Sequence, residues 1–262
     1  MARLIRAPGS LAMLPPALLI VGGFVAWQRY GAQRVRAAAG VLEASAIHAA
    51  EPPPGVPRDV VERVVRRYAL HERSASEPGT PATLARCLSR SAWIDAVRGV
   101  RPRPGGGFDV DMTYRTPAAM VRVYKPGDDA PYYFPVDADG VLLPPTDFDR
   151  RQTADFIHID ASGAFTRRPV GEPFGDARVE AAASLAGMLH EYRDVLGVRE
   201  ITVDDGSIRS GDRDGAYLVV RRAGNVDIEW DSPPGYERPG ELTANEKLRR
   251  LLDVATNRRA ER

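Results

Sequence analysis

The feature that most constrains this chain is an uncharged apolar segment close to its N-terminus. No charged residue occurs between Arg6 and Arg29, and within that span the sequence LAMLPPALLIVGGFVAW at 11–27 is apolar or small throughout. As a helix, this segment with its uncharged flanks would be roughly 26–33 Å long, which is close to the hydrocarbon thickness of a bilayer. The sequence therefore predicts a short cytoplasmic tail at 1–10 and a transmembrane helix at 11–28.

Two other interpretations of this segment stay open. It could be a cleaved signal peptide, with AAAG at 37–40 as a small-residue cleavage site, or a buried helix of a soluble protein. Basic residues stand on both sides of the segment, so the positive-inside rule does not decide the orientation. The stretch at 29–56, which is rich in Ala, Arg and Pro and leads into EPPPGVP at 51–57, is typical of a linker.

The composition of the whole chain excludes some functions. Thirty-six basic residues against thirty-five acidic ones give a net charge of +1, without the basic excess that nucleic-acid binding requires. With Cys87 as its one cysteine, the chain cannot form an intramolecular disulfide. We therefore expect a fold that depends on its packed core, and no nucleic-acid partner.

The region 57–117 reads as a small α+β domain. Apolar residues recur at helical spacing from Val60 to Tyr68, and Thr80 followed by Pro81 is a typical helix start. Leu84, Cys87 and Leu88 would form the buried side of that second helix. Further on, RPGGG at 103–107 predicts a turn, and residues 108–114 alternate between apolar and polar types as a half-buried strand does.

The region 118–262 predicts a second domain, with an antiparallel sheet and packed helices. We expect a long helix from Asp176 to Leu196 that stops at Gly197, and a terminal helix opened by a capping box of Thr243 and Glu246. The expected strands lie at 118–124, 131–136, 141–145, 201–203, 216–222 and 226–230.

The order of these landmarks resembles that of the FtsQ family of bacterial cell-division proteins, also called DivIB. The string SAWIDAVRGVRPRPGGGFDVDMTYRTPAAMVRVY at 91–124 carries a Trp-led strand, a turn and a strand that ends in Arg-x-Pro. YYFPVDADGVLLPP at 132–145, a helix, a two-stranded return and EKLRRLLDVA at 246–255 follow in the expected order. The resemblance covers almost the whole chain, and SAIHA at 45–49 is the candidate for the family's first strand.

This resemblance implies a fold and a location. It implies one transmembrane helix in the inner (plasma) membrane, with most of the chain on the periplasmic side. Next to the membrane it implies a POTRA domain (polypeptide-transport-associated), here 57–117, followed by a distal β-rich domain with a C-terminal helix, here 118–262.

The resemblance also implies a function: a divisome scaffold that binds single-pass coiled-coil partners of the FtsB and FtsL type. The binding would be β-augmentation, in which a partner strand completes an open sheet edge. The positions in this sequence that match the family's contact elements are Val226, Ile228 and Trp230 on the last strand and Leu248, Leu251 and Leu252 on the terminal helix.

The search for catalytic or metal-binding residues favours a non-enzymatic protein. The four histidines, His48, His71, His158 and His190, are scattered, and none has a metal-ligand spacing with Cys87 or with another histidine. No glycine-rich phosphate loop precedes a helix, and we expect no cofactor, metal or small-molecule substrate. Two alternatives stay open: a POTRA-containing factor of protein export or outer-membrane assembly, and a membrane-anchored hydrolase.

Overall fold

The computed structural model describes residues 42–104, 106–125, 127–128, 130–204 and 217–260. The chain is α+β, as the sequence predicts, with two sheets on which helices pack. Within the described ranges, no helix combines the length and the apolar character needed to cross a bilayer. The predicted tail at 1–10 and transmembrane helix at 11–28 lie outside the described residues.

The described chain divides into two compact units. The first unit contains the described residues up to Ala50, Val61–Cys87 and Arg98–Asp111, and the second contains Glu51–Val60, Leu88–Val97 and the residues from Met112 onward. The units therefore interleave along the sequence, whereas the ranges 57–117 and 118–262 expected from the sequence are contiguous.

A three-stranded sheet with the order β1-β3-β2 forms the N-terminal part of the fold. Its strands are β1 (Ile47–His48), β2 (Ile94–Pro102) and β3 (Phe108–Tyr114). β1 lies within the SAIHA segment, so a strand forms there as expected, and it pairs in parallel with β3, with Ile47 opposite Phe108. Gly107, at φ +86°, brings the chain so close to β1 that a Cβ there would lie 2.2 Å from the carbonyl oxygen of Ala46. Only glycine fits at that position.

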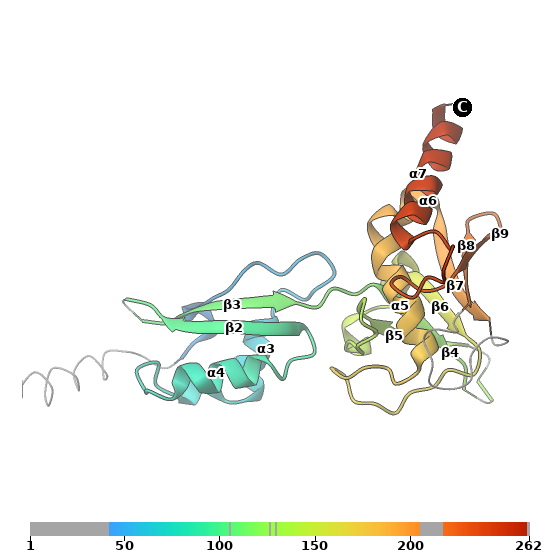
Figure 1. The fold of residues 1–262 in the computed structure, drawn as a ribbon. Coiled ribbons are helices and arrows are strands. Elements are labelled where there is room, and N and C mark those ends of the chain that lie inside the picture. Colours follow the sequence, from blue (N-terminus) through green and yellow to red (C-terminus); the bar gives the residue numbers. More distant parts are fainter. Residues whose placement is uncertain (1–41, 105, 126, 129, 205–216, 261–262) are drawn as a thin grey trace, which may run out of the picture. The chain divides into compact units, whose positions relative to one another are not determined.

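Two helices cover one face of this sheet (Figure 1). They are α3 (Val60–Arg67) and α4 (Thr80–Leu88), at the positions expected from the sequence. The predicted buried side of α4 is confirmed, because Leu84, Cys87 and Leu88 are all buried. On β3, the buried side chains of Phe108 and Val110 alternate with exposed aspartates, so the strand has one apolar and one solvated face.

The second sheet has six strands in the order β5-β4-β6-β7-β8-β9. They are β4 (Ala119–Val123), β5 (Tyr132–Val136), β6 (Ile157–Ala161), β7 (Val198–Asp204), β8 (Tyr217–Arg222) and β9 (Val226–Asp231). The expected antiparallel sheet is correct for three pairings and wrong for two, because β6 runs parallel to both β4 and β7. A parallel neighbour needs a crossover connection, and the helical segment between β6 and β7 supplies one.

The predicted strand at 141–145 is also wrong. Its described residues form only isolated bridges, from Leu142 to Val136 and from Val141 to Pro173. Pro144 and Pro145 have no backbone N–H, so they cannot donate to a ladder, and a 3-10 turn begins at Pro145 instead.

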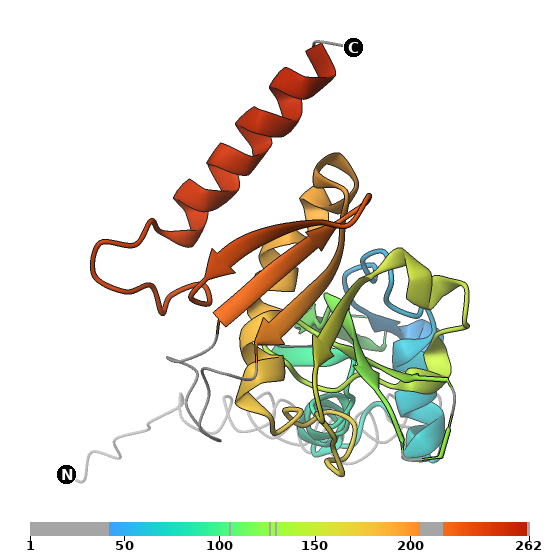
Figure 2. The same ribbon diagram turned by 90° about the vertical axis from the view of Figure 1, so that its right-hand side faces the viewer.

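The helix expected at 176–196 is broken in two. α5 (Ala177–Leu189) begins after Asp176, whose side chain accepts a hydrogen bond from the backbone N–H of Arg178. A 3-10 turn then leads to α6 (Arg193–Leu196), which stops at Gly197 as predicted, with φ +68°. Figure 2 shows α5 against one face of the six-stranded sheet, where its alanine-rich surface is buried. The last element is α7 (Ala244–Ala260).

Candidate functional site

Strand β9 forms one margin of the six-stranded sheet. It pairs with β8 on one side, and on the other side it has no neighbouring strand within the described part of the chain. Among the residues that the structure describes, no backbone hydrogen bond joins β9 to the proline-rich segment 232–243 that follows it. We call the unpaired side of residues 226–229 the open edge, because a bulge lies at Trp230 and the carbonyl oxygen of that residue accepts a hydrogen bond from Lys247. The free backbone groups of the open edge are those that an incoming strand can pair with.

The apolar side chains of β9 become less exposed toward its end. Val226 is 47% exposed, Ile228 is half-buried against the core, and Trp230 is only 1% exposed. Val226 and Ile228 share one face of the strand because side chains alternate along a strand. Trp230 lies in a bulge and is buried in the core against which Ile228 packs, and its carbonyl oxygen accepts a hydrogen bond from Lys247. A partner at the open edge would therefore touch the side chains of Val226 and Ile228.

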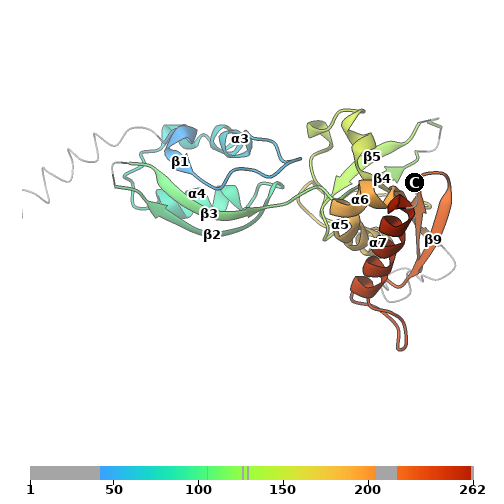
Figure 3. The ribbon, with the colours of Figure 1, turned by 90° about the horizontal axis from the view of Figure 1, so that it is seen from above.

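Helix α7 starts beside the end of β9 (Figure 3). The predicted capping box is confirmed: the Thr243 backbone N–H donates to the Glu246 carboxylate at 2.9 Å, and the Glu246 backbone N–H donates to Thr243 Oγ1 at 3.4 Å. Lys247, one residue further on, places its ammonium 5.4 Å from the centre of the Trp230 ring and donates to the Trp230 carbonyl oxygen. The start of the helix is thus fixed to the strand.

The segment between β9 and α7 is organised around one carboxylate. Glu241 accepts hydrogen bonds from the backbone N–H groups of Ser232 at 3.0 Å and Arg238 at 2.9 Å, and it also pairs with the Lys247 ammonium. Burial alone would raise the pKa of Glu241, but the backbone N–H donors and Lys247 outweigh it and lower the pKa to about 2. The hydrogen bonds of Glu241 and Lys247 thus connect the end of β9 to the start of α7, and we call this set of bonds the clamp. The clamp leaves the open edge unpaired.

The structure brings the six residues expected to contact a partner onto two neighbouring elements. On α7, Leu248, Leu251 and Leu252 are partly buried and pack against the core of the second unit. Val254, which is 47% exposed on the same helix, was not among the predicted residues. Its position three residues after Leu251, at helical spacing, is the signal that would have included it.

Ion pairs run across the outer face of the sheet, opposite α5. Arg122 of β4 pairs with Asp160 of β6 at 3.4 Å and also with Glu200 of β7. Arg221 of β8 pairs with Glu200 and with Asp227 of β9, both at 2.9 Å. We call these five residues the charge row. Glu200, which is 9% exposed, lies between the two arginines, and its buried charge is compensated from both sides.

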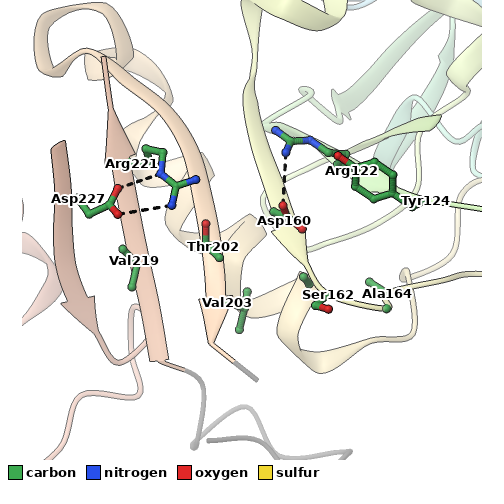
Figure 4. A pocket seen from close by; sticks show the side chains of 12 residues that line it. Arg122, Tyr124, Asp160, Ser162, Ala164, Thr202, Val203, Val219, Arg221 and Asp227 are labelled. Carbon is green, nitrogen blue, oxygen red and sulfur yellow. Dashed lines mark hydrogen bonds and ion pairs between the residues drawn. The ribbon is translucent and has the colours of Figure 1, made fainter. Parts of the chain in front are cut away.

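A hollow of about 710 Å³ lies on this outer face beside the charge row (Figure 4). Burial would lower the pKa of Arg122, but the charge of Glu200 and its hydrogen bond raise it above the ordinary value. The hollow is lined by Arg122, Tyr124, Asp160, Ala161, Ser162, Gly163, Ala164, Thr202, Val203, Val219, Arg221 and Asp227. Its charged groups are engaged in ion pairs with one another, as Figure 4 shows for Arg122 with Asp160 and Arg221 with Asp227.

Two titratable groups elsewhere, His158 and Asp137, have structural partners. His158 contacts the carbonyl oxygen of Thr153 at 3.0 Å and the ring of Tyr133 at 5.1 Å, and burial lowers its pKa. Asp137 caps its own turn by accepting from the backbone N–H of Val141 at 2.8 Å, and it pairs with Arg115. Across the described ranges, no three His, Cys, Asp or Glu side chains come together as metal ligands.

No protein-family model matches this chain, and no curated protein matches it. The open edge, α7 and the charge row are therefore interpreted from their own geometry.

Proposed function

We propose that this chain is a non-enzymatic, membrane-anchored scaffold of the cell-division complex, of the FtsQ type. It binds the extracytoplasmic part of single-pass coiled-coil proteins of the FtsB and FtsL type. The observation that carries the proposal is the open edge of β9, next to which α7 presents partly exposed leucines. The α+β architecture, with a small sheet ahead of a larger one, supports it.

The open edge suits strand addition better than it suits a solvent-facing margin. Proteins protect exposed edges with very short strands, proline, bulges, charged side chains or a covering loop. β9 has no proline, and its bulge and the hydrogen bond from Lys247 both lie at Trp230, beyond residues 226–229. The charged side chains of the strand are all acidic. In β-augmentation the main-chain hydrogen bonds supply affinity, and the side chains on alternate positions supply specificity. Val226 and Ile228 offer apolar contacts on one face of the strand.

Site-specific crosslinking tests this proposal. The full chain is expressed in its own host with p-benzoylphenylalanine in place of Val226, and membranes are irradiated before purification. We expect capture of a small single-pass coiled-coil protein, identified by mass spectrometry. Because Val226 is exposed and lies on the open edge, a docked strand would be within reach of the probe.

The matched control places the same probe at Val170, which is the same residue type and is 46% exposed, but lies in the loop between β6 and α5. Capture from Val226 and not from Val170 supports strand docking. Equal capture from both positions, or no capture from Val226, would contradict the proposal.

A further inference from the structure

The open edge ends a series of opposite charges that face one another across the sheet. Glu200, Arg221 and Asp227 stand directly opposite one another on β7, β8 and β9, and each neighbouring pair is in contact at 2.9 Å. Figure 4 shows the side chains of Arg221 and Asp227 turned toward each other on the outer face. The series stops at β9 with a carboxylate. The next side chain in register would belong to a strand added at the open edge.

The acidic character continues along β9. Glu229 follows Asp227 at the second position, so both carboxylates belong to the outer face of the strand. Asp231 lies beyond a bulge at Trp230, where the register with β8 shifts. Among the described residues, this face of β9 has one ion pair, between Asp227 and Arg221, and that arginine is shared with Glu200. The side chain of Asp227 remains 49% exposed despite the pair.

The side chain of Tyr217 on β8 lies close to the acidic residues of β9. The pKa of Tyr217 on β8 is raised, first by its partial burial and then by the negative charges of Glu229 and Asp231, to which it is hydrogen-bonded. A negative field disfavours a second negative charge and favours a cation at the same place. The other face of β9 is different, because Val226 and Ile228 are apolar.

We infer that the strand that docks on the open edge alternates lysine or arginine with apolar residues, with its basic side chains opposite Asp227 and Glu229. This inference rests on the proposed function, since it specifies the partner at the same edge. Opposite charges that face one another across a sheet stabilise the pairing, and like charges destabilise it. A strand in this register continues the alternation of the charge row and places its apolar side chains on the face of Val226.

Two synthetic probes test the inference. One is a fluorescein-labelled nine-residue peptide in which Lys alternates with Val and Thr, and the other has Glu at every Lys position. Each is titrated against the purified full chain at about 50 mM salt, and binding is followed by fluorescence anisotropy. We expect the Lys peptide to bind about tenfold more tightly than the Glu peptide, from two favourable pairs in place of two unfavourable ones.

Variants of β9 test whether this preference arises at the open edge. The double variant Asp227→Asn, Glu229→Gln should lose the preference, and Glu229→Lys should shift it toward the Glu peptide. The neutral double variant keeps the shapes of the side chains, so it serves where a reversed charge would disturb folding. The matched control is Asp109→Asn, Asp111→Asn, which removes two aspartates with the same spacing from β3, a strand in the middle of its sheet. The control should keep the full preference.

The outcomes separate this inference from the proposed function. If both peptides crosslink from Val226 with equal affinity, or if a native partner captured from Val226 docks an acidic strand, the inference is overturned while edge docking stands. A preference that survives neutralisation of β9 but disappears with the β3 control also overturns it. Failure of every probe and every native protein to crosslink from Val226 would overturn the proposed function itself.

Discussion

Replacement of Glu241 by glutamine should destabilise the clamp between β9 and α7. The carboxylate accepts from two backbone N–H groups and from Lys247, and an amide can accept with only one of its two terminal atoms. Its nitrogen would then face a donor. The fall of the Glu241 pKa from 4.5 to about 2 corresponds to at most about 3 kcal/mol, at about 1.4 kcal/mol per pH unit. We therefore expect Glu241→Gln to cost about 2 kcal/mol of unfolding free energy.

The same carboxylate should make the stability of the folded chain depend on pH, with stability lost as the pH falls. The pKa of Glu241 is lower in the folded chain than the ordinary 4.5, so its stabilisation is complete above about pH 5 and is lost as the pH falls from 4.5 toward 2. Urea unfolding of the full chain, followed by circular dichroism at pH 7 and pH 3, measures both effects. The gap between wild type and variant should be large at pH 7 and should narrow at pH 3.

A surface glutamate provides the control for this experiment. Glu172, whose side chain is 49% exposed, pairs with Arg168 at 3.6 Å, and Glu172→Gln should change stability by less than about 0.5 kcal/mol. Hydrogen exchange offers a local readout, because the amides of Ser232 and Arg238 lose their acceptor in Glu241→Gln. A variant with unchanged stability at pH 7 and unchanged exchange at these two amides would refute the account of the clamp.

Three further substitutions test other parts of the structure by the same urea unfolding. Glu200→Gln removes the charge between two arginines and should cost about 2–4 kcal/mol, and a cost below 1 kcal/mol would show that the buried pairs are not coupled. Gly187→Ala should destabilise the chain by about 1–2 kcal/mol although alanine favours helices, because a Cβ at Gly187 would lie 2.5 Å from the Cβ of Ala138. Adding Ala138→Gly to this variant should restore stability. A Gly187→Ala variant that is more stable than the wild type would contradict the close contact. Thr243→Ala removes the cap of α7 and should cost about 1 kcal/mol, with faster hydrogen exchange in the first turn of that helix and no change in α5.

Local patterns in the sequence predict the individual elements well. The capping box at Thr243 and Glu246, the glycine stop at Gly197 and the buried side of α4 all depend on residues close together in the chain, and all are confirmed. The break between α5 and α6 could not be read in this way. No proline or glycine marks the 3-10 turn at His190–Tyr192, so the apolar periodicity continues through it.

The order of the strands in the sheet could not be predicted from those local patterns. β6 was not predicted, although Ile157 and Ile159 alternate with His158 and Asp160 in the way typical of a half-buried strand. Its position between β4 and β7 depends on a crossover, and local alternation does not show which strands become neighbours. The charge row could not be predicted for the same reason, since its five residues come from five strands. β9 and α7 could be predicted from the sequence because each depends on residues that lie close together in the chain.

The acidic outer face of β9 also bears on contacts between two copies of this chain. If two open edges paired antiparallel with each other, both outer faces would lie on the same side of the joined sheet, and the carboxylates of Asp227 and Glu229 would stand among those of the second copy. Like charges facing one another across strands weaken such a pairing. A strand edge with unpaired backbone groups would otherwise favour dimers and aggregates. The carboxylates that select a basic partner therefore also keep the edge from being occupied by the protein itself.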